Sequence, residues 1–510
     1  MRKKVLIIGG GMAGLSAGAY LQMNGFETEI FELNSTPGGV CTSWKRGDYT
    51  VDWCVHWLVG SGASDSFYER WSELIDMQEL EIVDHEEYAV VEDVQGNRLH
   101  IYTDLDRLEH EMLTKAPEDE AQIKEFIAAC RHLVHLDMPN EQAMQVANFW
   151  YKIKAVWKML PYLGDFGKYS RISTADYANK FGNPLLHKAI YSLFEPEFPI
   201  LFCMMTLAWM HKKAAGYPIG GSLNFARRIA DRFEELGGKF QFDSRVSKIL
   251  VENGKAAGIE LANGETHSGD YVISAADAHS TIFDMLGSKF THPKLEEFFA
   301  NRQTFPSLVF VALGVGRTFH AAPHSYLISL EKPLEIDPET NLNDLYLRIH
   351  NFDPTLAPAG KTLVSCLMET RNWEYWTDLH RNNPQVYREE KQRIIDAIVD
   401  ILEKKLGNVR FFVEMTDVTT PATIISFTNN WKGSFEGWLL TTETGFKQLP
   451  NTLQDLENFF LCGQWVAVGG GLPTAMMSGR DVAQMICRQE GKHFEIVAPE
   501  HREALVGEEV

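Results

Sequence analysis

The stretch Lys4–Val5–Leu6–Ile7–Ile8–Gly9–Gly10–Gly11–Met12–Ala13–Gly14 decides the fold of this chain. An apolar run of strand length leads directly into the glycine spacing G-x-G-x-x-G, and residues 13–24 have the composition of a helix. Such a strand–turn–helix unit holds a pyrophosphate at the helix N-terminus, where free N–H groups and the helix dipole favour negative charge. We therefore predict a pyrophosphate-binding turn formed by Gly9, Gly11, Met12, Ala13 and Gly14.

A second predicted strand, residues 27–31, ends at Glu32, about 20 residues beyond the glycines. A carboxylate at this position accepts hydrogen bonds from ribose hydroxyls. The pair Gly38–Gly39 and the following Val40 are expected to return along the same cofactor. The alternative interpretation, a glycine-rich turn without a ligand, leaves the strand, the spacing and the acid unexplained.

The C-terminal part of the chain carries a second glycine motif. Apolar residues 459–462 lead into glycines, and a further glycine run, 469–471, precedes a predicted helix. Backbone N–H groups in such a motif can reach a polar ligand. Contacts from opposite ends of the chain imply a long ligand, which favours FAD over NAD. The residues expected to contact it are Gly463, Gly470, Gly471, Leu472 and Thr474.

Together these motifs resemble those of the flavin amine oxidase and phytoene desaturase superfamily. Residues 47–52 with the following His56, residues 217–222 and residues 353–361 narrow the resemblance to phytoene desaturases, carotenoid isomerases and retinol saturases. The resemblance implies an α/β fold: a Rossmann-like FAD-binding domain of the glutathione-reductase and amine-oxidase type with an inserted α+β substrate domain. It also implies that Val246 lies beside the adenine through main-chain contacts.

The expected domains are discontinuous. Residues 1–72, 216–290 and 452–492 would form the FAD-binding domain. Residues 73–215 would form a mainly helical insertion that faces substrate and membrane, with helices over 106–114, 118–137 and 141–160. Residues 291–451 would form a mixed sheet–helix substrate domain whose long helix, 384–406, ends at Gly407. Residues 493–510 would be a polar tail.

Composition excludes several classes of protein. The 510 residues carry a formal net charge of -21, which argues against nucleic acid as a partner. The seven cysteines are scattered without a C-x-x-C motif, so neither a disulfide scaffold nor a zinc site is predicted. The first strand begins within four residues of the N-terminus, and the longest apolar stretch, 200–210, is too short to span a bilayer. We expect a cytoplasmic protein, or one peripheral on the inner membrane face.

The flavin would supply the redox chemistry, and the protein would supply binding and orientation. The sequence contains no Ser-His-Asp arrangement, no zinc-protease motif and no conspicuous carboxylate pair. His56, Trp57 and Trp431 are the candidate catalytic residues, and Trp438 and Trp465 are further candidates for the pocket. For each of them a purely structural role is the alternative. Residues 151–163 alternate lysines with apolar side chains, as in a helix at a membrane surface; ordinary helix packing is the alternative.

These observations predict an FAD-dependent oxidoreductase that desaturates, saturates or isomerises a carbon–carbon bond of a lipophilic, isoprenoid or polyene-like substrate by hydride transfer at flavin N5. One alternative is a flavin amine oxidase. Another is a non-catalytic prenyl-binding escort protein of the same fold. The sequence leaves open the substrate, the redox direction and the electron donor or acceptor.

Overall fold

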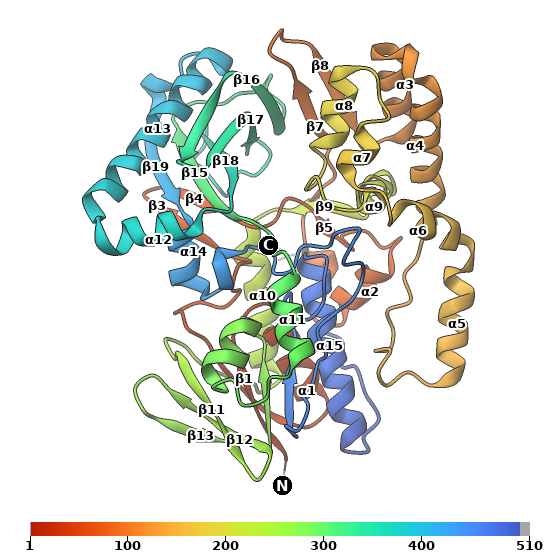
Figure 1. Ribbon diagram of the computed structural model, residues 1–510, viewed down its shortest axis with the longest axis vertical. Helices are drawn as coiled ribbons and strands as arrows, with labels where there is room; N and C mark the ends of the chain where they lie inside the picture. Colours follow the sequence, from red (N-terminus) through yellow and green to blue (C-terminus); the bar gives the residue numbers. More distant parts are fainter. Residues whose placement is uncertain (1, 500–510) are drawn as a thin grey trace, which may run out of the picture.

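A parallel sheet gathers strands from distant parts of the chain. The computed structural model describes residues 2–499 and has the predicted α/β fold (Figure 1). The strand order is β10 (Lys239–Gln241), β2 (Glu27–Phe31), β1 (Lys4–Ile8), β14 (Tyr271–Ser274) and β20 (Phe459–Leu461). Ile8 lies opposite both Phe31 and Ser274, so the carboxyl ends of the central strands meet at the edge where the glycine turns follow.

Alternating apolar residues of β1 bury both faces of this sheet, as the period of a strand requires. Val5 and Ile7 belong to the core formed with α1 (Met12–Met23), α10 (Gly221–Glu235) and α15 (Leu472–Gln489). Leu6 and Ile8 belong to the core of the opposite face. That face is covered by a second sheet, in the order β11 (Val246–Glu252), β12 (Lys255–Leu261) and β13 (Thr266–Ser268).

The sequence has two Asn-Gly pairs between predicted strands, a strong signal for hairpins, and both close hairpins in this second sheet. Asn253 has a φ of 51° and Gly254 a φ of 78°, the pair of positive values that a type I′ turn requires. In the other hairpin Gly264 alone of the pair is left-handed, with a φ of 87°.

A seven-stranded sheet extends across the upper part of Figure 1, from β19 at the left to β7 and β8 right of the centre, in the order β19-β15-β18-β17-β16-β7-β8. The predicted strands within 291–451 and the helix α13 (Pro384–Leu406), which ends at Gly407, are present. The β7–β8 hairpin is an unpredicted strand pair within 73–215, and β7 joins β16 in parallel. The strands are β7 (Glu87–Glu92), β8 (Arg98–Tyr102), β15 (Ser307–Val315), β16 (Ser325–Asp337), β17 (Thr340–Ile349), β18 (Thr362–Thr370) and β19 (Val413–Thr419).

The helices between β8 and β9 gather around an apolar core of their own, except that α5 buries Tyr151 and Ala155 in a separate small cluster with Ala147. The first two agree with the predicted segments, but the third was predicted to begin too early: residues 141–148 are not helical, and Asn148 caps the helix by accepting a hydrogen bond from Tyr151 N–H. These helices are α3 (Leu105–Lys115), α4 (Glu120–Leu133), α5 (Phe149–Met159), α6 (Leu163–Tyr169), α7 (Thr174–Ala178), α8 (Pro184–Tyr191) and α9 (Ile200–His211).

Smaller elements complete the fold. The two-stranded sheet pairs β3 (Ser43–Arg46) with β4 (Tyr49–Asp52), and a three-stranded one has the order β5 (Leu58–Val59), β9 (Ala215–Pro218), β6 (Ile82–Val83). The remaining helices are α2 (Ser66–Ser72), α11 (Pro293–Asn301), α12 (Trp373–Asn382) and α14 (Pro421–Thr428).

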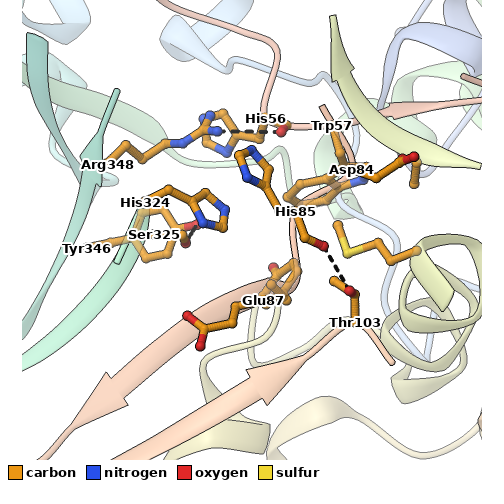
Figure 2. Close-up of a pocket in the computed structure, with 13 residues that line it drawn as sticks. His56, Trp57, Asp84, His85, Glu87, Thr103, His324, Ser325, Tyr346 and Arg348 are labelled. Atoms are coloured by element: carbon orange, nitrogen blue, oxygen red, sulfur yellow. Dashed lines mark hydrogen bonds between the residues drawn. The ribbon is translucent and has the colours of Figure 1, made fainter. Parts of the chain in front are cut away.

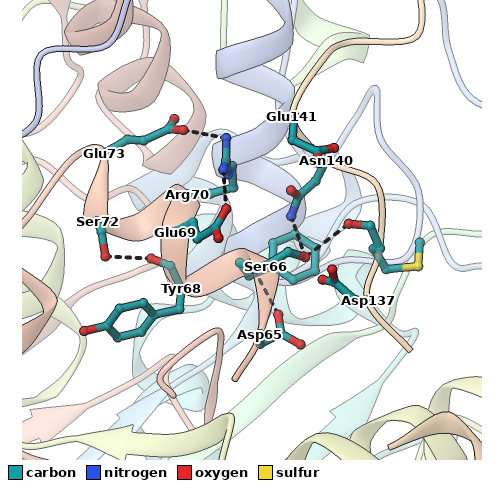
Figure 3. Close-up of polar contacts among 12 residues, drawn as sticks. Asp65, Ser66, Tyr68, Glu69, Arg70, Ser72, Glu73, Asp137, Asn140 and Glu141 are labelled. Atoms are coloured by element: carbon teal, nitrogen blue, oxygen red, sulfur yellow. Dashed lines mark hydrogen bonds and ion pairs between the residues drawn. The ribbon is translucent and has the colours of Figure 1, made fainter. Parts of the chain in front are cut away.

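A buried polar network fixes the chain ahead of α5 against α2 and α15. Figure 3 shows its α2 side, where Asn140 donates to Ser66 Oγ at 3.1 Å. Glu73 accepts hydrogen bonds from Arg70, from Arg480 Nε at 2.8 Å and from the Tyr20 hydroxyl at 2.7 Å. Arg480 also donates to the backbone oxygen of Glu141 at 2.8 Å. Because every charge in the network has a partner, it can be buried without a large cost.

The tail is anchored as far as the structure describes it. Phe494 packs on Tyr20 with ring centroids 5.7 Å apart, and Glu495 N–H donates to Asn24 Oδ1 at 2.8 Å. Residues 493–497 therefore lie against α1, whereas the predicted tail residues 500–510 lie outside the described residues.

Helical glycines allow two close approaches of α1, one at Gly14 to its own preceding turn and one at Gly479 to α15. A Cβ on Gly14 would lie 2.0 Å from Gly9 O, and a Cβ on Gly479 would lie 2.2 Å from Ala13 O.

We expect Gly479→Ala to force α1 and α15 apart and to destabilise the protein by about 1–3 kcal/mol in urea unfolding. The control Gly167→Ala adds a methyl group in open space on α6. It should leave the unfolding free energy unchanged or raise it by up to about 1 kcal/mol. Equal effects of the two substitutions would contradict the packing argument.

Candidate functional site

The N-terminal glycines form a turn that the segment after β2 lines on its other side. Gly10 N–H donates to Glu32 Oε2 at 2.7 Å, and Gly38 N–H donates to Gly10 O at 2.8 Å. Gly11 and Gly38 form an isolated parallel bridge. The pair Gly38–Gly39 therefore returns beside the first turn, in the geometry that the sequence suggested for contacts to one shared ligand.

The N-terminus of α1 is open to a ligand. Its N-cap residue, Gly11, has no side chain to accept a hydrogen bond from the first turn of the helix. A Cβ on Gly11 would meet its nearest atoms, in Gly38 and Gly39, at 3.9 Å, an ordinary contact distance. The N–H groups without a side-chain cap and the helix dipole suit a phosphate group at this end of the helix.

Glu32 lies at the edge of this turn with an acceptor face toward it. Burial raises the pKa of its carboxyl, while hydrogen bonds from Gly10 and Asn34 oppose that shift. Ser244 N–H donates to the Glu32 backbone oxygen at 2.8 Å. Val246, two residues further on, packs in the same apolar core as Phe31. The position of Val246 is thus compatible with its predicted place beside a base.

The C-terminal motif lies against the N-terminal one. Cys462 N–H donates to Ser274 O at 3.0 Å, and a Cβ on Gly463 would lie 3.3 Å from the Cβ of Ala13. Helix α15 starts with Leu472 behind Gly471, and again no side chain caps the helix. Leu472 and Thr474 remain partly exposed at this interior end. The chain thus brings two helix N-termini without side-chain caps, from the contacting helices α1 and α15, to one region of the fold, and these residues fit an extended dinucleotide.

A group of glutamates faces the interior beside the C-terminal glycines. A Cβ on Gly470 would lie 2.3 Å from Glu436 Oε2. Burial, and then the negative charge of Glu369, raise the pKa of Glu436 to about 7. Burial raises the pKa values of Glu195 and Glu369, and the charge of Glu369 raises that of Glu195 further, so this pair retains a proton at neutral pH. No carboxylate pair could be predicted from the sequence, because these residues are far apart along the chain.

A polar pocket opens between β17, β16 and the β7–β8 hairpin (Figure 2). It contains about 400 Å³ of empty space, its mouth included. The imidazoles of His85 and His324 are stacked at its centre with centroids 3.6 Å apart. Burial lowers the pKa of His85 to about 4 and that of His324 well below its usual range, so both are neutral at pH 7. Predicted residues His56 and Trp57 also line the pocket.

Of the candidate catalytic residues, His56 and Trp57 lie together, and Trp431 lies elsewhere. Trp431 stacks on His279 with ring centroids 4.7 Å apart, and its backbone N–H donates to Asp277 Oδ2 at 2.9 Å. Trp438 and Trp465, which are 0% and 2% exposed, pack beside it in the apolar core. These tryptophans form a cluster separate from the polar pocket. Sequence reasoning missed His85, His324 and Arg348 as pocket residues.

A row of aromatic side chains connects the polar pocket with the C-terminal glycines. The Trp57 ring lies 6.2 Å from Phe194, which stacks on Phe198 at 5.6 Å. Phe198 lies 5.9 Å from Phe305, and Phe305 lies 5.4 Å from Phe435, the neighbour of Glu436. Rings of this kind offer apolar surface that suits an apolar or conjugated ligand.

Two further features concern the described residues 2–499. No helix among them has the length and apolar character that crossing a bilayer requires. Their histidine, cysteine and carboxylate side chains form no cluster suited to a metal ion.

Comparison with known proteins agrees with this geometry. A family model described as flavin containing amine oxidoreductase matches residues 12–487. The chain is 24% identical to the 4,4'-diapophytoene desaturase (4,4'-diapolycopene-forming) of Methylomonas sp, over 97% of each chain. It is also 24% identical to the chloroplastic prolycopene isomerase of Daucus carota, over 95% of this chain and 80% of that protein.

Solved structures share the fold at low sequence identity. An oxidoreductase from Methanosarcina mazei aligns with a TM-score of 0.57 and 18% identity, over 94% of this chain and 99% of that one. A putrescine oxidase variant aligns with a TM-score of 0.63 and 12% identity, over 96% and 99% of the two chains.

The interior glutamates predict a pH-dependent effect on stability. The pKa of Glu436 is about 7 in the folded chain against an ordinary 4.5. Its ionisation therefore destabilises the folded state above pH 7 and has no effect below about pH 4.5. We expect Glu436→Gln to raise the thermal midpoint at pH 8, with a gain that shrinks as the pH falls through 7 toward 4.5. Glu443→Gln, which changes an exposed side chain further along the same segment, is the control. A gain at pH 8 that persists at pH 4.5 would contradict this assignment.

Proposed function

This chain belongs to the flavin-containing amine oxidoreductase family, and it is a flavin-dependent oxidoreductase. We propose that its flavin is FAD and that it acts on a carbon–carbon bond of a lipophilic, polyene-like substrate. The observation that carries the proposal is the pair of helix N-termini without side-chain caps that opposite ends of the chain contribute through the contacting helices α1 and α15. An NAD site of the Rossmann type needs only one such unit, whereas an extended FAD can use both.

The proposed contacts between residues and FAD follow from the positions of these two helix N-termini. Gly9, Gly11, Met12, Ala13 and Gly14 would hold the pyrophosphate, and Glu32 would accept hydrogen bonds from the adenosine ribose. The motif of Gly463 to Thr474 would lie along the flavin end. There the uncapped N-terminus of α15 would favour negative charge on the flavin ring. Bound flavin supplies a hydride acceptor or donor, and the protein's task is to hold a substrate carbon against it.

Support for a polyene comes from two sources. The aromatic row offers flat apolar surfaces along the interior, and relatives along nearly the full chain are named as carotenoid desaturases and prolycopene isomerases. The protonated Glu195–Glu369 pair lies where it could hold a proton near a reacting double bond. His56 is neutral, because burial and the charge of Arg348 keep its pKa well below the usual range, so its proposed role is in binding rather than as an acid.

The reaction is tested by anaerobic reoxidation. The bound flavin is reduced with dithionite, excess reductant is removed, and carotenoids, retinoids, unsaturated fatty acids and amines are added in turn. We expect an unsaturated lipid to restore the oxidised flavin spectrum, or to be isomerised without a spectral change. Reduction of the oxidised flavin by an amine, with peroxide formed in air, would instead support the amine oxidase alternative. A protein that binds no flavin would support an escort role.

Substitution of Glu32 tests the cofactor site. We expect Glu32→Ala to weaken FAD binding about 10- to 100-fold, because a charged hydrogen-bond acceptor is lost. The matched control is Glu27→Ala, which removes an exposed glutamate from the same strand. Binding is measured by reconstitution with FAD and followed by flavin fluorescence, with unfolding measured in parallel. Unchanged FAD affinity in Glu32→Ala would exclude the proposed contact.

We further propose that α5 docks on a membrane surface, from which a lipophilic substrate could enter. The helix lies at the margin of the molecule (Figure 1). Its exposed apolar side chains include Phe149, Trp150 and Trp157, which are 68%, 75% and 69% exposed. Large aromatic residues beside lysines are typical of helices that insert at the interface of a bilayer.

Liposome flotation tests this contact. We expect wild-type protein to float with vesicles of phosphatidylglycerol and phosphatidylcholine, and the double variant Trp150→Ser/Trp157→Ser to remain at the bottom. Lys158 pairs with Asp137 at 2.5 Å, so lysine substitutions are a less direct test than removal of the indoles. Phe411→Ser is the control, because Phe411 is 87% exposed on the distant η5 turn (Arg410–Phe412). Equal flotation of wild type and the α5 variant would refute docking through this helix.

A further inference from the structure

Arg348 is a buried cation without an acidic partner. It lies in β17 and is 3% exposed. Its Nη1 and Nη2 atoms donate to the backbone oxygens of Val55 at 3.2 Å and His56 at 3.4 Å, while its Nε is buried without any hydrogen-bond partner. A buried charge held only by neutral acceptors is costly, and an unpaired N–H group adds to that cost.

The acids nearest in the fold are already occupied. Asp52 accepts a hydrogen bond from Ser222 N–H at 2.8 Å, and Asp353 accepts from Gly220 N–H at 3.0 Å. Both carboxylates also accept from the Tyr217 hydroxyl. These bonds fix the acids against the start of α10. Arg348 influences Asp52 through space, but no hydrogen bond joins the two.

The rest of the pocket presents donors rather than negative charge. His85 Nε2 is buried without a partner, next to the stacked ring of His324. Figure 2 shows the carboxylates of Asp84 and Glu87 pointing away from the stacked rings. Glu87 is paired with His100 Nδ1 at 2.7 Å. The centre of the pocket therefore combines a guanidinium with neutral imidazoles and lacks an anion.

We propose that this pocket binds a carboxylate carried at the end of the lipophilic substrate. The inference rests on the proposed function and specifies its substrate class: unsaturated or polyene acids rather than plain hydrocarbons. The Nε–H of Arg348 and an imidazole N–H would donate to the carboxylate, and guanidinium–carboxylate contacts are among the strong hydrogen bonds in proteins. The carbon chain would follow the aromatic row from Trp57 toward the C-terminal glycines.

The test compares retinoate with retinol, which share a polyene and differ at the end group. Binding to the FAD-loaded protein is measured by quenching of tryptophan fluorescence, since Trp57 lines the pocket. We expect retinoate to bind at least about tenfold more tightly than retinol, the effect of one charged hydrogen bond. Equal affinities would overturn the proposal.

Substitutions of Arg348 test whether this residue causes the preference for retinoate. Arg348→Gln should abolish the preference for retinoate, and Arg348→Lys, which keeps the charge but loses the planar fork, should reduce it. Circular dichroism and flavin content check that each variant is folded. If the glutamine variant does not fold, the result for Arg348→Lys decides whether Arg348 causes the preference for retinoate. Arg302→Gln is the matched control, because Arg302 is also buried with an unpartnered nitrogen but lies outside the pocket. A preference that survives both Arg348 substitutions would overturn the proposal.

Two further arms separate the explanations. Inorganic phosphate and acetate are titrated alone; if either binds through Arg348 as tightly as retinoate, the pocket is a site for free anions and the proposal fails. Reoxidation of reduced flavin is followed in the same samples. Retinoate preference without reoxidation by any unsaturated lipid would refute the carbon–carbon chemistry while leaving the carboxylate site intact. Reoxidation by hydrocarbons, without a preference for retinoate over retinol, would support the carbon–carbon chemistry and refute the carboxylate site.

Discussion

The contact between α1 and α15 is the constraint on which the rest of the structure depends. It joins residues near the two ends of the chain, and it exists only because Gly479 has no Cβ to collide with Ala13 O. Ser16 Oγ donates to Met476 O at 2.7 Å across the same interface. Because the helices touch, the start of α1 lies beside Gly479, within α15, and a single long ligand could reach the N-termini of both helices.

Burial of charge separates the structural parts of this molecule from the functional ones. Arg480 and Glu73 are buried together with Tyr20 and Arg70, and each charge finds an opposite charge or a hydrogen bond. Arg348 is as deeply buried and finds only backbone oxygens. A folded chain gains nothing in stability from an unpaired interior cation. Arg302 is also buried with an unpartnered nitrogen, but only Arg348 of the two lines the polar pocket, and this position indicates a role in binding.

The sequence predicted the parts of the fold that depend on local pattern. Gly9 to Gly14, the Asn253–Gly254 turn and the helix ending at Gly407 are each specified by neighbouring residues, and all are present. The β7–β8 hairpin was missed, although the turn around Gly96, with a φ of 86°, offered a signal. Its pairing with β16 joins residues more than 200 positions apart, which no local pattern encodes.

The distinction between local sequence patterns and contacts between distant segments also applies to the candidate site. The cofactor residues form motifs, so sequence alone suggested them, and their roles stay predictions. The polar pocket and the glutamate group have no motif, because His85, His324 and Arg348, like Glu195, Glu369 and Glu436, meet only through the fold of separate segments. His56 and Trp57 were found by the resemblance of the preceding strand, whereas their neighbours across the pocket were not.

An anchored polar end would change what an apolar passage can do. Hydrophobic contact is non-directional, so an aromatic row alone lets a polyene slide and presents many bonds to the flavin in turn. A carboxylate held by Arg348 would fix one end of a stiff conjugated chain, and the length of the chain would then determine which carbon lies against the ring. Regiospecificity would follow from distance along the aromatic row rather than from recognition of the reacting bond. The polar pocket would hold one end of the substrate, and the cofactor site, built from other segments, would act on the bond at a fixed distance from that end.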